Sequence, residues 1–371
     1  MTMLALTCIA QTALLTVAAW TLPMLARPTL PFGVRVPAGR TADPAITAQR
    51  RRYARAVLFL GALAALLSAF AVVLTGDPDV LAVAGVLLGV ADAMLYAAAH
   101  RAVRAAKRRG NWYGGTRQAV TADTTWRTDP VRPPWALLLV SLIVLAATAA
   151  IGLGRYSSLP STLATLRGLG IDVHNRVPTS PMTAFAPVLS QTALTILVPL
   201  LLAAIVRARP ETDAEQPASS ARRYRVYLRG IATILLAGVA CVDLTLLLLA
   251  LQQWGLLTPS PLVAAATWAP TLAIAAAFLL FGVRAGEAGH RLPSLRGESD
   301  SGYVQRDDDR HWHLAGTVYA NRHDPAVLVH QRAGSRWTLN LGNPVAWAIL
   351  AVVAVLALLS LLGVVELPST G

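Results

Sequence analysis

The stretch "GVACVDLTLLLLAL", residues 238–251, carries one charged residue, Asp243, inside an aliphatic run with no other charge from Gly230 to Leu251. About 20 such residues, at 1.5 Å each along a helix, cross a hydrocarbon core of roughly 30 Å. The run therefore predicts a membrane-spanning helix that places a carboxylate within the bilayer.

Seven further runs have the same character, and they exclude a water-soluble globule. The chain has 371 residues, of which 55% are hydrophobic and 14% charged, against roughly 25% charged residues in soluble domains. Strands that cross lipid would alternate apolar with polar residues, whereas these runs are apolar on every side. The sequence predicts an all-α polytopic membrane protein with about eight transmembrane helices, at 3–23, 56–75, 79–99, 135–154, 183–206, 230–252, 262–283 and 344–365.

The domain organisation follows from the parts that are not apolar. Residues 1–283 form a membrane domain with seven of the helices, and residues 284–307 form a polar linker. In residues 308–343, "HWHLAGTVYA", "AVLVHQ" and "RWTLNL" alternate with turn signals, which predicts a small cytoplasmic β-rich domain with three antiparallel strands. The eighth helix follows directly.

Basic residues are sorted onto alternate connections, 29 on one set and three on the other. Because Lys and Arg resist translocation, the basic set is predicted to be cytoplasmic and both termini outside. No Lys or Arg precedes Arg27, so we expect the first run to be an uncleaved anchor. The net charge of +13 is explained by this sorting, with membrane lipid as the partner and no nucleic acid. Arginine outnumbers lysine 31 to 1, which favours a bacterial plasma membrane.

Two carboxylates in the predicted spans are candidate functional groups. A charged residue at the centre of a spanning helix costs about 2.5–3.5 kcal/mol, so it faces protein or water. Gly85, Gly89, Asp92 and Tyr96 share one helix face, where the glycine pair permits close approach and Tyr96 can donate to Asp92. The polar groups are either packing contacts or a proton relay or polar substrate site, formed by Gln11, Asp92, Tyr96, Gln191, Thr195 and Asp243.

Motifs for catalysis, cofactors or metals are not recognised in the sequence. There is no P-loop, no His-Glu zinc helix and no nucleophile motif. Cys8 and Cys241 lie in predicted spans, and the four histidines of residues 308–343 lack the convergent ligands that a metal needs. We therefore expect a protein that is not an enzyme and has no catalytic, cofactor or metal residues.

Several stretches are similar to a known family. "PFGVRVP" (31–37), "RRY" (51–53) and "RYSSLPSTLATLRGLGID" (155–172) resemble the SdpI-like group of bacterial integral membrane proteins. "YANRHDPAVLVHQRAGSRWTLNLGNP" (319–344) resembles a short uncharacterised domain found at the end of such proteins. Thr165 or Leu166 stands where the family has a histidine. The family-motif residues are Pro31, Phe32, Gly33, Leu159, Pro160, Asn321, Asp324, Pro325, Trp337, Thr338 and Asn340.

The resemblance implies two possible roles, immunity against a secreted toxin and reception of a signal that is passed to a transcription repressor. Its partners would be an extracellular peptide or small ligand and a cytoplasmic regulator. Two alternatives stay open on the residues alone. One is a secondary transporter that uses Asp92 and Asp243, and the other is a structural membrane scaffold.

Overall fold

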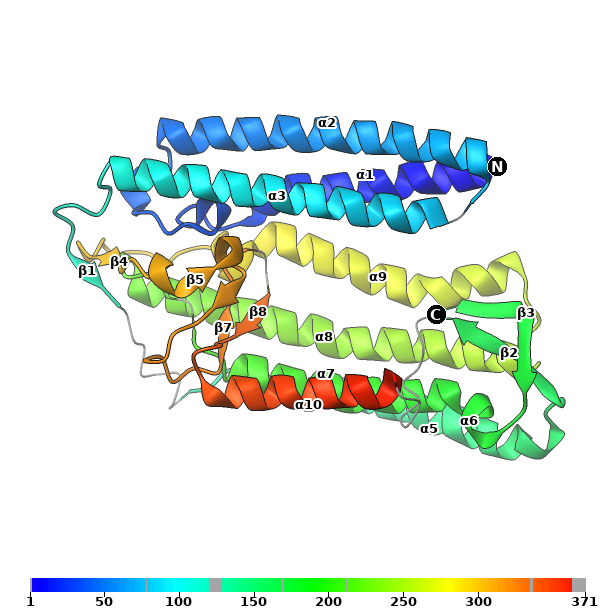
Figure 1. Ribbon diagram of the computed structural model, residues 1–371. Helices are drawn as coiled ribbons and strands as arrows, with labels where there is room; N and C mark the ends of the chain where they lie inside the picture. Colours follow the sequence, from blue (N-terminus) through cyan, green and yellow to red (C-terminus); the bar gives the residue numbers. More distant parts are fainter. Residues whose placement is uncertain are drawn as a thin grey trace. The chain divides into compact units, whose positions relative to one another are not determined.

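The computed structural model describes residues 2–77, 79–120, 129–167, 170–210, 212–333 and 336–361, and most of them are helical (Figure 1). Among the described residues, seven helices are long and apolar enough to cross a membrane. Each falls on a predicted span, which confirms an all-α multi-pass membrane protein. They are α1 (Thr2–Leu25), α2 (Pro44–Thr75), α3 (Asp79–Arg109), α5 (Leu138–Arg155), α7 (Ala186–Val206), α8 (Pro217–Gln253) and α9 (Pro261–Ala285).

Two shorter helices are also described. The one-turn helix α6 (Pro181–Ala184) precedes α7. Helix α10 (Pro344–Leu361) lies at the eighth predicted span. The predicted end of that span, residue 365, lies outside the described residues.

Several helices continue well beyond the predicted spans. Helix α2 begins 12 residues before its span: the Asp43 side chain accepts a hydrogen bond from Ala45 N (2.9 Å), and Pro44 occupies the first helical position. Both features are typical of helix starts. The added turns carry arginines, which are good helix formers but cannot lie in lipid. Hydropathy therefore found the part of each helix that crosses the bilayer rather than the whole helix.

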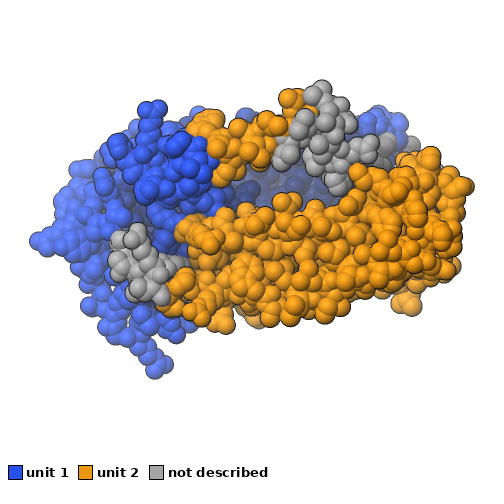
Figure 2. Space-filling view, turned by 90° about the horizontal axis from the view of Figure 1, so that it is seen from below, with its two compact units in different colours: residues 1–123, 209–224, 285–346 blue, residues 124–208, 225–284, 347–371 orange. Residues whose placement is uncertain are grey.

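The chain divides into two compact units, each built from separated segments (Figure 2). Unit 1 comprises residues 1–123, 209–224 and 285–346, and unit 2 comprises residues 124–208, 225–284 and 347–371. Helix α8 contributes its first eight residues to unit 1 and the rest to unit 2. The structural units therefore combine distant parts of the chain, whereas the division expected from the sequence follows the chain in order.

In unit 1, helices α1, α2 and α3 lie side by side (Figure 1). Helices α1 and α2 approach closely at Gly61, where an added Cβ would lie 2.0 Å from Thr16 Oγ1. The Tyr53 hydroxyl of α2 donates to Ala19 O of α1 (3.0 Å). Small residues and such hydrogen bonds replace the hydrophobic effect, which does not act between helices in lipid.

A short turn, Pro31–Gly33, is anchored against these helices. The Phe32 side chain is fully buried, and its ring meets the rings of Tyr53 and Tyr96 edge-on at 5.3 and 5.6 Å. His100 Nδ1 of α3 lies 2.8 Å from Phe32 O. These aromatic and polar contacts fix the connection that follows α1 to helices α2 and α3.

Residues 304–341, described apart from 334–335 and called the docked segment below, contain short strands. In the antiparallel pairs, β5 (Trp312–His313) pairs with β6 (Val318–Tyr319), and β7 (Leu328–His330) pairs with β8 (Trp337–Leu339). β4 (Val304–Gln305) pairs in parallel with β1 (Gln118–Ala119). The prediction of three strands was wrong, because Leu314–Gly316 adopt positive φ angles and reverse the chain inside the first predicted strand.

Unit 2 has an antiparallel hairpin that the sequence analysis did not predict. Strands β2 (Thr162–Arg167) and β3 (Gly170–Pro178) form it, and Gln253 Nε2 at the end of α8 donates to Ala164 O (3.0 Å). The Trp254 indole donates to Ala184 O (3.0 Å). The signal available in the sequence was two runs in which apolar and polar residues alternate, one on each side of a glycine.

Replacing Gly33 with alanine should loosen the docked segment. Gly33 has φ +75, and an added Cβ would lie 2.6 Å from Ala315 O. The left-handed backbone alone costs another residue about 1–2 kcal/mol. We expect a lower melting temperature and faster proteolysis within residues 304–341 of the detergent-solubilised protein. Gly39→Ala is the matched control, because nothing lies within 4 Å of the Cβ it would add; equal behaviour of the two variants would refute this role for Gly33.

Candidate functional site

A polar cluster surrounds Asp243 in the apolar part of unit 2. The Asp243 side chain is fully buried, and Thr195 Oγ1 donates to its Oδ2 atom (3.2 Å). Gln191 Nε2 donates to the Asp243 backbone oxygen (2.8 Å) and to Thr148 Oγ1 (3.1 Å). Ser141 of α5 is also fully buried, and its hydroxyl oxygen has no hydrogen-bond partner among the described residues. Helices α5, α7 and α8 thus bring together three of the predicted site residues, Asp243, Gln191 and Thr195.

The cluster has unused hydrogen-bonding capacity. Asp243 Oδ1 and Gln191 Oε1 are buried and have no hydrogen-bond partner among the described residues. A buried oxygen without a partner costs about 1–3 kcal/mol, and more if it is charged. The site therefore favours a proton or a cation that would satisfy these oxygens.

The other three predicted site residues, Gln11, Asp92 and Tyr96, belong to unit 1. Asp92 is buried, and its Oδ1 atom has no partner among the described residues. Tyr96 makes no hydrogen bond to Asp92 in the described structure; its ring contacts Phe32 and Tyr53 instead. Gln11 Nε2 donates to Leu81 O (3.1 Å). Three of the six predicted residues thus belong to unit 1 and three to unit 2.

The glycine pair beside Asp92 is only partly used for close packing. A Cβ added to Gly85 would lie 2.5 Å from Gln11 Nε2, whereas one added to Gly89 would meet nothing within 4 Å. Helix α1 thus approaches α3 closely at Gly85 and not at Gly89.

Arg332 holds the docked segment against the turn after α1. Its side chain is 1% exposed, and its NH1 group donates to Gly33 O (3.1 Å). The guanidinium forms ion pairs with Asp308 and Asp309 and lies over the Trp312 ring, 5.0 Å from its centroid. One buried cation therefore joins residues that are up to 299 positions apart.

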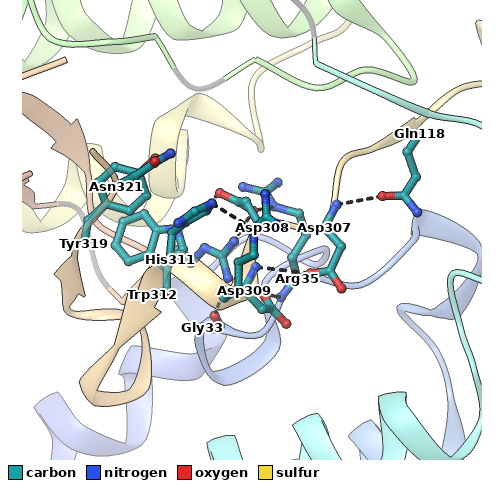
Figure 3. Close-up of polar contacts among 12 residues, drawn as sticks. Gly33, Arg35, Gln118, Asp307, Asp308, Asp309, His311, Trp312, Tyr319 and Asn321 are labelled. Carbon is teal, nitrogen blue, oxygen red and sulfur yellow. Dashed lines mark hydrogen bonds and ion pairs between the residues drawn. The ribbon is translucent and has the colours of Figure 1, made fainter. Parts of the chain in front are cut away.

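Asp307, Asp308 and Asp309 form an acidic triplet beside Arg35 (Figure 3), and Lys107 is a further cation at this triplet. Arg35 Nε lies 2.8 Å from Asp308 Oδ1, and Lys107 Nζ lies 2.6 Å from Asp309 Oδ2 and 2.8 Å from Asp307 Oδ1. Arg35 comes from the connection after α1 and Lys107 from the last turns of α3. The network therefore ties the docked segment to two other parts of unit 1.

The electrostatics keep Asp308 and Asp309 ionised. Burial acts to raise the pKa of Asp308, but the charges of Arg35 and Arg332 outweigh burial and hold the pKa below its usual value. Burial also acts to raise the pKa of Asp309, but the charges of Arg332 and Lys107 outweigh burial. The pKa of Asp309 is therefore lowered as well. Both groups are therefore charged at neutral pH.

The family-motif residues of the docked segment bond mainly to one another. Asn340 Nδ2 donates to the backbone oxygens of Asn321, Asp324 and Ala326, each at 3.0 Å, and Asn340 Oδ1 accepts from Asn321 N (2.9 Å). The Tyr319 hydroxyl donates to Asp324 Oδ2 (2.9 Å). These side chains shape the loop between β6 and β7.

The remaining motif residues also have structural contacts. Pro325 O accepts from Asn343 Nδ2 (3.0 Å), the Trp337 ring meets the His330 ring edge-on, and Thr338 pairs with Val329. In unit 2, Leu159 and Pro160 precede the hairpin, where the Thr179 hydroxyl donates to Pro160 O.

Sequence reasoning missed the acidic triplet and the role of Arg332. The triplet was divided between the polar linker and the β-rich domain, and Arg332 appeared only as one letter of the family-like stretch 319–344. A run of three aspartates in an Arg-rich chain was a signal for ion pairing, although it does not identify the partners.

The chain was compared with protein-family models, curated proteins and solved structures, and none of them matches it.

Replacing Arg332 with methionine should destabilise the docked segment by about 3–5 kcal/mol, because buried partners are left without their cation. The pH dependence should change as well. In the native protein the lowered carboxyl pKa values stabilise the segment above about pH 4, the pKa of an unfolded aspartate, and this stabilisation is lost as acid protonates them. In Arg332→Met the loss of stability in acid should be smaller and should be complete at a higher pH, because the pKa values of Asp308 and Asp309 are lowered less.

Hydrogen exchange of residues 304–341, followed against pH in the full-length protein, measures this effect. Arg336→Met is the control, because Arg336 is exposed and its side chain makes no described ion pair. The same pH profile for Arg332→Met and the native protein would contradict the assigned role.

Proposed function

We propose that this is a receptor or sensor of the bacterial plasma membrane, of the SdpI-like type, rather than an enzyme. In this proposal the β2–β3 hairpin lies outside and meets a peptide or small ligand, and the docked segment lies in the cytoplasm and contacts a regulator. A toxin-immunity factor would use the same arrangement. The sorting of basic residues to the end of the helices that bears the docked segment supports this orientation.

The observation that carries the proposal is the pair of contacts made by helix α8. Within unit 2, Gln253 at its end donates to the hairpin at Ala164 O. Within unit 1, the Tyr224 ring near its beginning meets the His330 ring of β7 edge-on, with 6.2 Å between centroids. Ser219 N also donates to Glu298 Oε2 (2.7 Å). No proline interrupts the helix between Tyr224 and Gln253.

A continuous helix with these contacts can relay a change at the hairpin to the docked segment. The polar cluster at Asp243 lies on the same helix, ten residues from Gln253, and in this proposal the helices change their packing there. A ligand would act by binding one arrangement more tightly than the other.

Gln253→Ala should increase hydrogen exchange in residues 304–341 of the full-length protein in nanodiscs, since it cuts the link between hairpin and helix. Gln252→Ala is the matched control. The Gln252 side chain is next to Gln253 in the sequence, but it donates hydrogen bonds to Leu248 O and Thr267 Oγ1 rather than to the hairpin. Exchange that is unchanged in Gln253→Ala would argue against relay through α8. In cells, deleting residues 308–341 should reproduce the transcriptional effect of deleting the whole gene.

A second candidate function, secondary transport, is favoured by the buried carboxylate of Asp243 and its unsatisfied oxygen. In proteoliposomes, Asp243→Asn should lower proton flux at least tenfold, and Thr233→Val, an exposed change on the same helix, should leave it unaltered. If replacing both Asp92 and Asp243 by asparagine leaves the flux unchanged, transport by these groups is excluded.

A further inference from the structure

A polar cavity of about 310 Å³ lies within unit 1, beside the turn that follows α1. Its walls come from residues 27–41, 212–223 and 288–290. Sites for small molecules begin at about this size. The residues of the Asp243 cluster do not line it, so the cavity is separate from that cluster.

One group of lining residues is basic. Arg27, Arg223 and His290 line the cavity, and Arg223 forms no ion pair with a described residue. Burial lowers the pKa of His290 to about 4, and the positive charges of Arg27, Arg291 and Arg223 add to that decrease. Arg27 and Arg223 thus place two guanidinium groups at the wall of one cavity. Guanidinium groups arranged in this way recognise phosphate.

A second group of lining residues is acidic. Glu215 Oε1 accepts from Ala38 N (3.3 Å), and Asp213 Oδ1 accepts from Glu215 N (3.2 Å). Burial raises the pKa of Glu215, and the neighbouring charges of Asp213 and Asp300 raise it further. A cation bound here would relieve the repulsion between these carboxylates. The cavity therefore offers sites for both signs of charge.

The cavity lies where a membrane span ends. Arg27 is two residues beyond Leu25, the last residue of α1, and Arg291 NH2 donates to Met24 O (2.7 Å). The polar headgroup layer begins directly beyond the hydrocarbon core. Basic pockets at this depth are suited to phospholipid headgroups.

We propose that this cavity binds a phosphate group that carries a primary amine, as in the headgroup of an ethanolamine phospholipid. The phosphate would contact Arg27 and Arg223, and the ammonium would contact Asp213 and Glu215. Arg35 also lines the cavity, but its charge is engaged with Asp308.

The test measures the melting temperature of the full-length protein in detergent against three additives. These are an ethanolamine phospholipid, an anionic glycerol phospholipid and soluble glycerophosphoethanolamine. A ligand that binds only the folded state raises the melting temperature in proportion to its occupancy. The native protein should bind the ethanolamine lipid at least tenfold more tightly than either other additive.

Two variants test the basic and the acidic group of lining residues separately. Arg223→Gln should weaken the binding of both lipids at least tenfold. Glu215→Gln should remove the preference for the ethanolamine lipid and leave the binding of the glycerol lipid unchanged. Arg222→Gln is the control, because Arg222 is exposed on the same helix and does not line the cavity.

Unchanged lipid preference in both Arg223→Gln and Glu215→Gln would overturn the site. Equal stabilisation by the soluble headgroup would overturn the lipid as its source and assign the cavity to a soluble phosphate amine. If Arg223→Gln does not fold, the loss of preference in Glu215→Gln still decides the question.

Discussion

The fold of unit 1 depends on the buried guanidinium of Arg332. A cation removed from water must be paired, and here Asp308, Asp309 and the Gly33 carbonyl meet that requirement together. The requirement fixes both the docked segment and the turn after α1. The strands of the segment have two or three residues each, too few to be stable alone. Their position is therefore set by the ion network and the helices beneath it.

The polar cluster of unit 2 follows a different balance of energies. Burying a carboxylate in a spanning helix costs about 2.5–3.5 kcal/mol, whereas a hydrogen bond between membrane helices contributes about 0.6 kcal/mol on average. The described bond from Thr195 reaches the carboxyl group and does not offset that cost, and the two bonds from Gln191 go to the Asp243 backbone oxygen and to Thr148. On this balance, burial of the carboxylate destabilises unit 2.

Arg35 connects the headgroup cavity with the ion network in unit 1. It lines the cavity and pairs with Asp308, so a bound phosphate would change the electrostatic environment of the docked segment. Tyr224 approaches the same segment from α8. A receptor of this design would respond both to its ligand and to the composition of the surrounding membrane, in keeping with the proposed role.

The sequence alone determined the fold class and the positions of the spans, because lipid burial depends on the local run of apolar residues. It also identified Asp243, Gln191 and Thr195 as polar groups within spans. Only the tertiary structure decided which of them meet, that the first predicted strand of the docked segment reverses at Leu314–Gly316, and that Arg332 binds residues from both ends of the chain. Ion pairs and helix contacts join residues that are distant along the chain, and local periodicity carries no information about such partners.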